Sequence, residues 1–377
     1  MARLIAFYLP QYHPIPENDK WWGKGFTEWT NVAKAKPLYE GHYQPHVPAD
    51  LGFYDLRVPE TRAAQAAMAK EYGIEAFCYY HYWFAGKQIL ERPFDEILRS
   101  GDPDFPFCLC WANQTWTGVW HGSPNRVLIE QTYPGEEDHR AHFNTLLPAF
   151  LDRRYVTVDG KPLFLIYRPG EIPDVRRTMD LWRNMAAKAG LKGLHIVAVL
   201  HHKNVWIPEN HGFDACVRSY LNPRREQWVS WRQPVKKIVL FYQQQRGIPT
   251  VYPYEKVMMD VFPDKAEHIK DYPCLLPNWD NTPRSGAEGV VLHGSTPELF
   301  RRQVRRALEF IEECDGEHQI IFIKSWNEWA EGNHLEPDLK YGKKYLEALR
   351  EELGQTTAIK PRDAGSLSAV PTVSIDT

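Results

Sequence analysis

The chain has 377 residues and a formal net charge of -3, with 43% hydrophobic and 25% charged residues. These proportions are typical of a globular protein, and the absence of a basic field argues against nucleic acid as a partner. The first residues turn polar too soon for a signal peptide, and no apolar run approaches the length of a membrane span. We therefore expect a cytoplasmic protein without an integral membrane segment, of undetermined oligomeric state.

Cysteine and histidine give no sign of a metal site. None of the six cysteines forms a Cys-x-x-Cys pair, and five lie in or beside strand-like segments, as small buried side chains of a reduced protein do. His42 and His46 have a metal-like spacing, but Pro45 forbids an ordinary helix there and no third ligand is nearby in the sequence. We expect neither a metal nor a cofactor.

Short β-rich segments recur along the chain, and helical patterns lie between most of them. Several of these segments are apolar throughout, which is typical of parallel strands covered on both faces. The sequence predicts eight strands, at 4–8, 74–80, 107–111, 163–167, 194–200, 214–218, 273–276 and 320–324.

The predicted helices span 59–72, 136–152, 175–189, 295–313 and 343–353. The first begins with a proline and is expected to stop at Gly73, because glycine commonly follows the last helical residue. By the same argument the third ends at Gly190 and the last at Gly354. The fourth is opened by the sequence Ser-Thr-Pro-Glu at 295–298.

This alternation predicts an α/β fold, a (β/α)8 TIM barrel forming a single domain over residues 1–354. A doubly wound open sheet is the alternative, but no Gly-x-Gly-x-x-Gly follows the first strand and no P-loop sequence appears. Two connections are long, at about 9–58 after the first strand and about 219–272 after the sixth, and long loops in compact domains are usually functional. The tail, 355–377, lacks periodicity and is expected to be disordered.

In such a barrel the active site lies at the C-terminal ends of the strands. The residue types found there are indoles, phenols, amides and carboxylates. In chain order, the predicted substrate-binding residues are Tyr8, Gln11, Tyr12, His13, Glu28, Trp29, His81, Trp83, Trp111, Asn113, Trp116, Tyr167, His201, Asn278, Trp279, Asp280, Arg284, Trp326 and Asn327.

Amides and carboxylates hydrogen-bond hydroxyl groups, and aromatic faces cover the C–H face of a sugar ring. The predicted partner is therefore a neutral, polyhydroxylated molecule, an oligosaccharide or polysaccharide; no phosphate cradle is indicated. Other readings stay open for some positions. The indoles of Trp83, Trp111 and Trp326 can fill the core, one of His201 and His202 can be structural, Asp280 can pair with Arg284, and Glu28 can brace the first loop.

Two acids in the loop after the last strand are the predicted catalytic residues. Glu328 and Glu331 follow an apolar strand and lie among indoles, where carboxylates are costly unless they serve a function. Paired carboxyl groups are the usual means of breaking a glycosidic bond. Side chains three residues apart share a pocket only if the backbone turns, so we expect a turn at Trp329-Ala330, which Gly332 would permit.

The sequence Asn-Glu-Trp-Ala-Glu-Gly at 327–332 resembles the signature of glycoside hydrolase family 99 and of the related WbsX-type proteins found in polysaccharide gene clusters. The WbsX resemblance spans roughly residues 3–350. It includes Ala-Phe-Tyr-Leu-Pro-Gln-Tyr-His-Pro at 6–14, Gly-Phe-Thr-Glu-Trp at 25–29 and Tyr-Tyr-His-Tyr-Trp-Phe at 79–84. It continues through Trp-Ala-Asn-Gln-Thr-Trp at 111–116, Gly-Lys-Pro-Leu-Phe at 160–164 and Trp-Asp-Asn-Thr-Pro-Arg at 279–284.

Family 99 enzymes are (β/α)8 barrels that cleave internal α-mannosidic bonds with retention. The resemblance implies that Glu331 is the general acid and base, with a pKa raised by Trp326 and Trp329. It implies that Glu328 takes the proton of the sugar 2-hydroxyl, which then forms a 1,2-anhydro sugar. The first-strand motif, however, is typical of WbsX-type proteins and not of the mannosidases. Glycosyl transfer in O-antigen or capsular polysaccharide synthesis, and a non-catalytic glycan-binding barrel, therefore remain alternatives.

Overall fold

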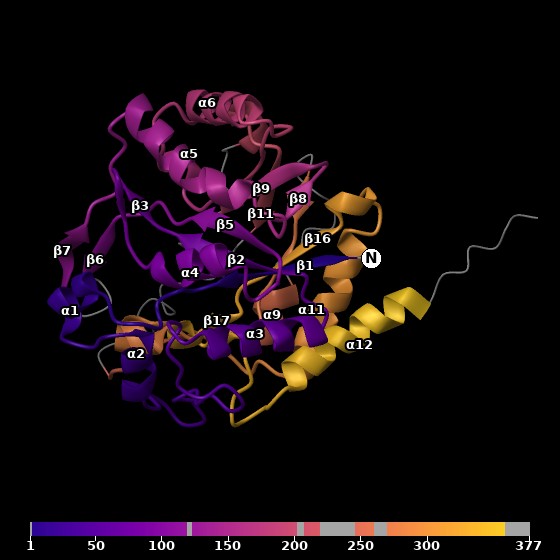
Figure 1. Ribbon diagram of the computed structural model, residues 1–377. Coiled ribbons are helices and arrows are strands. Elements are labelled where there is room, and N and C mark those ends of the chain that lie inside the picture. The colour runs from indigo at the N-terminus through magenta and orange to yellow at the C-terminus, as the bar shows by residue number, and fades with distance from the viewer. Residues whose placement is uncertain (1, 119–122, 202–206, 219–245, 260–269, 359–377) are drawn as a thin grey trace, which may run out of the picture.

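The computed structural model describes residues 2–118, 123–201, 207–218, 246–259 and 270–358, to which all structural statements refer (Figure 1). Its centre is a nearly closed parallel β-barrel surrounded by helices, so the predicted fold class is confirmed. The barrel strands are β1 (Arg3–Tyr8), β2 (Ala76–His81), β5 (Phe107–Trp111), β9 (Lys161–Ile166), β10 (His195–Leu200), β11 (Ala215–Arg218), β13 (Asp271–Tyr272), β14 (Cys274–Leu275) and β16 (Ile320–Ile323).

The barrel closes through a divided seventh strand. β13 pairs with β11 on one side and β14 pairs with β16 on the other, both in parallel, with Pro273 between them. Proline lacks the N–H that a continuous ladder requires, which explains the division. The carbonyl oxygen of Pro273 still accepts from the N–H of Phe322 at 2.9 Å, so the two halves together occupy one strand position.

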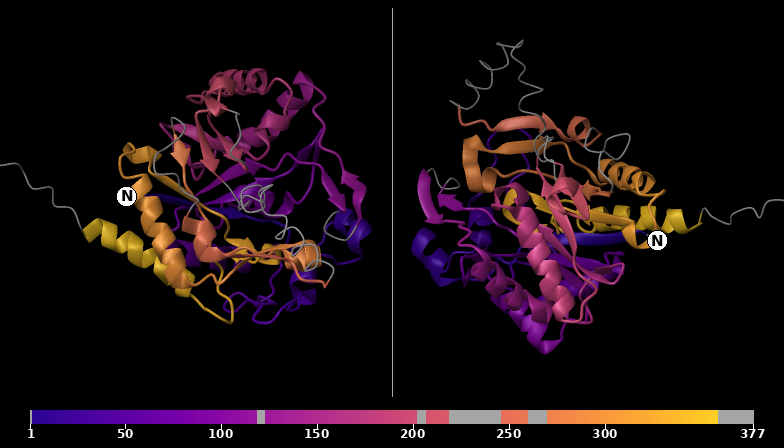
Figure 2. Two further views of the ribbon diagram at one scale, coloured as in Figure 1. Left: turned by 180° about the vertical axis from the view of Figure 1, so that it is seen from behind. Right: turned by 90° about the horizontal axis from the view of Figure 1, so that it is seen from above.

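The helices pack around this barrel (Figure 2). The principal ones are α3 (Pro59–Glu71), α4 (Arg92–Ser100), α5 (Glu136–Phe150), α6 (Val175–Lys188), α9 (Tyr254–Met259), α11 (Pro297–Phe310) and α12 (Lys344–Ala358). Gly73 and Gly190 follow their helices with φ of 84° and 85°, as predicted. The predicted stop at Gly354 is wrong, because α12 continues to Ala358. Glycine weakens a helix by about 1 kcal/mol relative to alanine but ends it only where φ turns positive.

The first long connection carries α1 (Pro16–Trp22) and α2 (Glu28–Lys34). Smaller elements decorate the strand ends: β3 (Trp83–Phe84) pairs with β4 (Lys87–Gln88), and β6 (Trp116–Gly118) pairs with β7 (Ser123–Ile129). Further along, β8 (Thr157–Val158) joins β9, and β12 (Thr250–Pro253) pairs with β15 (Val290–His293). The short helix α10 (Thr282–Ser285) follows the seventh strand. The tail 359–377 and most of the second long connection lie outside the described residues.

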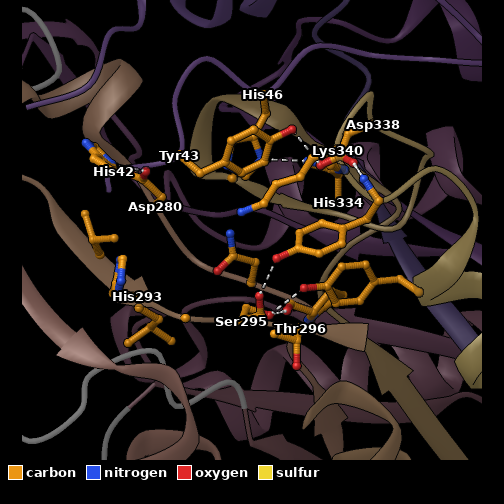
Figure 3. A pocket seen from close by; sticks show the side chains of 18 of the residues that line it. His42, Tyr43, His46, Asp280, His293, Ser295, Thr296, His334, Asp338 and Lys340 are labelled. Carbon is orange, nitrogen blue, oxygen red and sulfur yellow. Dashed lines mark hydrogen bonds and ion pairs between the residues drawn. The ribbon is translucent and has the colours of Figure 1, made fainter. Parts of the chain in front are cut away.

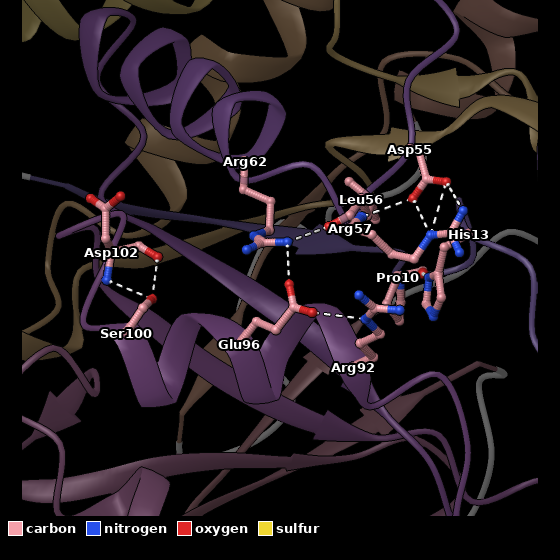
Figure 4. A network of polar contacts seen from close by, with 10 residues as sticks. All are labelled: Pro10, His13, Asp55, Leu56, Arg57, Arg62, Arg92, Glu96, Ser100 and Asp102. Carbon is pink, nitrogen blue, oxygen red and sulfur yellow. Dashed lines mark hydrogen bonds and ion pairs between the residues drawn. The ribbon is translucent and has the colours of Figure 1, made fainter.

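A polar network fixes α3 against α4 at the edge of the barrel (Figure 4). The buried guanidinium of Arg62 donates to Leu56 O at 2.5 Å and to Glu96 Oε2 at 2.9 Å. The other oxygen of Glu96 accepts from Arg92 Nε at 2.7 Å. The ion pair with Glu96 thus compensates the buried charge of Arg62, whose Nε has no hydrogen-bond partner among the described residues.

Two predictions about the core and the surface can be compared with the structure. The six cysteines are free and five of them are buried, as the sequence predicted. Across the described ranges, the helices lack the combined length and apolar character that crossing a membrane demands.

Candidate active site

The loop that follows β16 turns back on itself. β17 (Asn327–Glu328) and β18 (Asn333–His334) form an antiparallel pair, joined by a single helical turn at Trp329–Glu331. Gly332 has φ of 59°, and a β-carbon on it would lie 2.9 Å from Asp280 Cβ. The predicted turn is confirmed, and it brings the carboxyl group of Glu331 close enough for its charge to act on Glu328.

Residues of the first connection hold this loop in place. The amide of Asn327 accepts from the backbone N–H of Leu9 at 2.7 Å and donates to Leu9 O at 3.0 Å. The hydroxyl of Tyr12 donates to Asn327 O and accepts from the N–H of Trp329. Both side chains were predicted to bind substrate. The described contacts of the Asn327 amide are with Leu9 and Tyr54, and the Tyr12 hydroxyl contacts the backbone that carries the two acids.

A third acid in this loop, Glu336, was missed by the sequence analysis. It is buried and accepts from Tyr54 Oη at 2.8 Å, Gln65 Nε2 at 2.6 Å and Trp329 Nε1 at 2.6 Å. Burial raises its pKa to about 7. Tyr8, a predicted substrate contact, joins the same network by donating to Gln65 Oε1 at 2.7 Å. The sequence does show a third acid in this loop, but the hydrogen-bond donors that surround it come together only in the tertiary structure.

Arg284 links the loop that carries Glu328 and Glu331, here called the catalytic loop after their proposed role, to the first long connection. Its guanidinium is almost fully buried and pairs with Glu28 at 3.1 Å and with Glu331. Burial acts to lower the pKa of Arg284, but the negative charges of Glu28 and Glu331 hold it above its ordinary value. Asp280 has partners of its own among the described residues. Its Oδ2 accepts from Gln44 Nε2 at 2.7 Å and lies 2.7 Å from His42 Nε2, and its Oδ1 accepts from the N–H and the hydroxyl of Thr282.

Of the two acids Glu328 and Glu331, the structure raises the pKa of Glu328, whereas the family resemblance implied a raised pKa for Glu331. Burial raises the pKa of Glu328 to about 8, and the negative charge of Glu331 acts in the same direction. The positive charges of Lys324 and Arg284 oppose this shift. One carboxyl oxygen of Glu328, Oε2, is buried without a hydrogen-bond partner among the described residues. Glu331 is the more exposed acid, with 14% of its side chain accessible.

Lys324, at the end of the last strand, was not singled out from the sequence. Its ammonium group lies 3.4 Å from Tyr167 Oη and 5.6 Å from the ring centres of both Tyr167 and Trp279. Its pKa is raised: burial opposes the charged form, but the surrounding Tyr167, Glu328 and Glu331 outweigh it. The sequence feature that could have identified Lys324 is its position as a single charged residue directly after the apolar residues 320–323.

Strand alternation decides which residues of β2 face the acids. Burial, and then the charge of Glu328, raises the pKa of both Tyr80 and Tyr82, so these two phenols lie near the acids. His81 points the other way, with its Nε2 at 2.9 Å from that of His142 in α5. Trp83 stacks on the same His142 ring at 4.8 Å. Successive side chains of a strand face opposite sides, so the predicted His81 belongs with the helices and the unselected Tyr80 and Tyr82 with the site.

Three indoles contact the core. Trp111 is 1% exposed and packs against Trp182, with ring centres 6.1 Å apart. Trp326 is 0% exposed and its ring centre lies 5.2 Å from that of Phe77. Together with Trp83, these residues make the contacts expected if they fill the core, which was the alternative reading of each.

The remaining predicted residues surround the strand ends. Asn113 brackets the end of the fourth strand, accepting from Arg168 N at 2.7 Å and donating to Arg168 O at 2.9 Å. His201 Nε2 lies 2.9 Å from Tyr167 O. The others are Gln11 and His13, which are buried; Trp29, whose Nε1 donates to Tyr54 O; Trp116, which packs on Tyr82; and Asn278, which lines a cavity. His202 lies outside the described residues.

Three comparisons place this geometry among known proteins. The chain is 40% identical over 353 residues to two proteins named uncharacterized protein WxcX, from Xanthomonas campestris pv. campestris strains B100 and ATCC 33913. The match covers 93% of this chain and 50% of each relative, so the chain spans about half the length of these relatives.

Solved structures with a similar fold share little sequence. One is a glycoside hydrolase-like protein, with a TM-score of 0.54, 15% identity and 93% of each chain covered. Another is the GH99 endo-alpha-mannosidase from Bacteroides thetaiotaomicron in complex with bis-tris-propane, with a TM-score of 0.52 and 14% identity, covering 94% of this chain and 98% of the other. At this identity the likeness concerns the fold.

The family model described as glycosyltransferase WbsX matches residues 4–349, almost the whole barrel. The chain belongs to the WbsX glycosyltransferase family.

Proposed function

We propose that this protein acts on an α-linked, mannose-like glycan and cleaves its glycosidic bond with retention. Glu328 takes the proton of the sugar 2-hydroxyl, and O2 attacks the anomeric carbon to form a 1,2-anhydro sugar. The bond to the leaving oxygen breaks as Glu331 donates a proton to that oxygen. Water then attacks the anomeric carbon and gives a proton to Glu331, while O2 recovers its proton from Glu328.

The observation that carries this proposal is the closeness of two carboxyl groups at the end of the last barrel strand, where the charge of Glu331 acts on Glu328. Two carboxyl groups this close hold one proton between them over a wide pH range, so the pair presents one acid and one base at neutral pH. With its pKa raised to about 8, Glu328 binds a proton more tightly than an ordinary carboxylate, as abstraction from a sugar hydroxyl requires. Under the proposal, the proton that Glu328 holds in the resting site passes to Glu331 when the glycan binds.

Two cations support the same assignment. Arg284 pairs with both Glu331 and Glu28, and Lys324 lies close enough to influence both Glu328 and Glu331. Placed at the edge of the same site, the two groups stabilise negative charge that develops on the sugar oxygens. The phenols of Tyr80, Tyr82 and Tyr167 and the indole of Trp279 offer hydroxyl donors and ring faces to a sugar.

Glycosyl transfer is the second candidate, and the description of the family favours it. In that reaction an acceptor hydroxyl replaces water in the second step, and the same two acids suffice. Binding without turnover is the third, and a titration calorimetry experiment that records sugar binding in the absence of any reaction would favour it.

The experiment that separates these functions uses one purified protein and two substrate sets. The protein is incubated first with α-mannan oligosaccharides and then with nucleotide-sugar donors plus an acceptor oligosaccharide. Release of reducing ends from the oligosaccharides alone, absent in Glu331→Gln, is the expected result. Turnover that requires an activated donor contradicts hydrolysis and establishes transfer.

A further inference from the structure

A cavity of about 260 Å³ adjoins the catalytic loop, and Asp280 and Gly332 form part of its lining (Figure 3). Three buried groups with metal-binding atoms line the same cavity: His46, His334 and Asp338. One ligand atom from each lies within 4.8 Å of the other two. His46 comes from the first long connection and the other two follow the catalytic turn, so distant segments of the chain converge here.

Both imidazole rings are held with a nitrogen toward this centre. His334 Nδ1 lies 2.9 Å from Glu336 O, and that contact requires its hydrogen, which leaves the lone pair on Nε2. The Nε2 atom therefore accepts from His46 Nδ1 at 2.9 Å, and a cation that binds here replaces this hydrogen, with His46 carrying its hydrogen on Nε2. Ring stacking fixes both orientations: His334 lies on Trp329 with centres 3.7 Å apart, and His46 lies on Tyr43 at 4.3 Å.

The carboxylate of Asp338 is positioned by two donors. Its Oδ2 accepts from Tyr43 Oη at 3.0 Å, and its Oδ1 accepts from the backbone N–H of Tyr341 at 2.6 Å. The nearby ammonium group of Lys340 lies over the rings of Tyr43 and Tyr341, at 4.3 and 4.8 Å from their centres. A ligating carboxylate supported by outer hydrogen bonds is the usual arrangement in metal sites.

We propose that His46 Nδ1, His334 Nε2 and one oxygen of Asp338 bind a divalent transition-metal cation of the zinc class, with the remaining coordination position facing the cavity. Two imidazoles and one carboxylate are ligands that zinc accepts, at about 2.0–2.2 Å from each atom. Binding requires the two nitrogens to separate by a few tenths of an ångström and Asp338 to move toward them, because tetrahedral ligands at those lengths lie about 3.3–3.6 Å apart.

The bound cation fastens the first long connection to the catalytic loop. His46 is two residues beyond Gln44, which holds Asp280, and His334 is three residues beyond Glu331. A metal bridge between these segments therefore adds to the contacts that set the position of Glu331. Its removal is expected to loosen the catalytic loop, although the metal itself takes no part in the chemistry proposed above.

The test measures metal binding directly and does not depend on activity. Chelator-treated protein is titrated with Zn²⁺ by calorimetry, and its thermal midpoint is measured with and without the ion. We expect one high-affinity site per chain and a higher midpoint with zinc. Asp338→Asn and His46→Gln should each weaken binding by more than about 100-fold, and Tyr43→Phe, which removes only a support of Asp338, by about 10-fold.

The matched control is His293→Gln, a histidine that lines the same cavity outside the cluster. It should bind zinc as the unaltered protein does. Absence of a zinc-dependent midpoint shift, or equal binding by the Asp338→Asn and His293→Gln variants, overturns the proposal. Co²⁺ spectroscopy of the unaltered protein identifies the type of ligand without relying on variants, some of which can fail to fold. A thiolate-to-cobalt charge-transfer band would assign the ion to a cysteine and also overturn it.

Discussion

Arg284 and Glu28 form a buried ion pair at 3.1 Å between the seventh and first barrel connections, with 4% and 1% of their side chains exposed. Because Arg284 also pairs with Glu331, one guanidinium joins Glu28 of the first long connection to one of the two proposed catalytic acids. The pair explains how two segments about 250 residues apart share one site.

Breaking this pair should destabilise the protein strongly. In Arg284→Met, Glu28 stays buried without its partner, and we expect a loss of about 3–5 kcal/mol in the free energy of unfolding. The double variant Glu28→Gln/Arg284→Met should recover part of it. Denaturant unfolding measures both. Arg57→Met, which breaks the exposed pair with Asp55, is the control and should cost no more than about 1 kcal/mol. Equal losses in the two single variants would contradict the argument.

Removing either acid should abolish most activity without unfolding the chain. Glu328→Gln and Glu331→Gln are each expected to lower kcat by about 10²- to 10⁴-fold, the usual contribution of a general acid or base. Circular dichroism should be unchanged. Glu351→Gln, on the exposed side of α12, is the control and should keep full activity. Near-normal turnover in either catalytic variant would refute the proposed roles.

The contribution of Glu328 to stability should fall as the pH rises from about 5 to 8. The folded state raises the pKa of Glu328 to about 8, so between its unfolded pKa and pH 8 this group binds more protons in the folded protein than in the unfolded chain. One such group lowers the free energy of unfolding by up to about 1.4 kcal/mol per pH unit. Buried histidines such as His81, whose pKa is lowered to about 3, act in the opposite direction below about pH 6.5 and are common to the unaltered protein and the variant Glu328→Gln. The measurement is therefore the difference in thermal midpoint between the unaltered protein and Glu328→Gln, which should change in favour of Glu328→Gln as the pH rises.

Lys324 should control the pH dependence of catalysis. Its positive charge lowers the pKa of Glu328, so Lys324→Met should raise that pKa further and move the pH–rate profile to higher pH. Lys324→Arg keeps the charge and should preserve the profile, although the larger group will change KM. Steady-state rates from pH 5 to 10 measure both. A profile that does not move in Lys324→Met would show that Lys324 does not act on Glu328.

Gly332 should be intolerant of any side chain. Its φ of 59° disfavours other residues, and an added β-carbon meets Asp280 Cβ at 2.9 Å and Asp280 N at 3.1 Å. Gly332→Ala should therefore combine about 1–3 kcal/mol of strain with displaced catalytic geometry and lower kcat. Gly342→Ala is the control that measures backbone strain without a steric clash, because Gly342 has φ of 54° but open space around it. The contrary result is full activity in Gly332→Ala.

Much of the site followed from sequence because strand ends are local features. The barrel, its strands and the turn at 329–331 were predicted from apolar runs, glycines and spacing, and the structure confirms them. The choice between neighbours on a strand was harder. In β2 the sequence analysis selected His81, yet Tyr80 and Tyr82 face the acids, since a shift of one residue reverses the side that a chain presents.

Partners were the least predictable feature. Asp280 was expected to contact substrate or Arg284, but it pairs with His42. His46 appeared to lack a third ligand because its neighbours in space, His334 and Asp338, lie far along the chain. Burial, together with the negative charge of Glu331, raises the pKa of Glu328.

The sequence by itself determined the barrel and the turn that carries Glu328 and Glu331, because hydrophobic periodicity and short motifs act over a few residues. Only the tertiary structure decided which charges meet. The pairing of Arg284 with Glu28 and Glu331 and the convergence of His46 with His334 depend on distances between remote segments. Those distances are set by barrel closure and by the way the first long connection packs across the last strand.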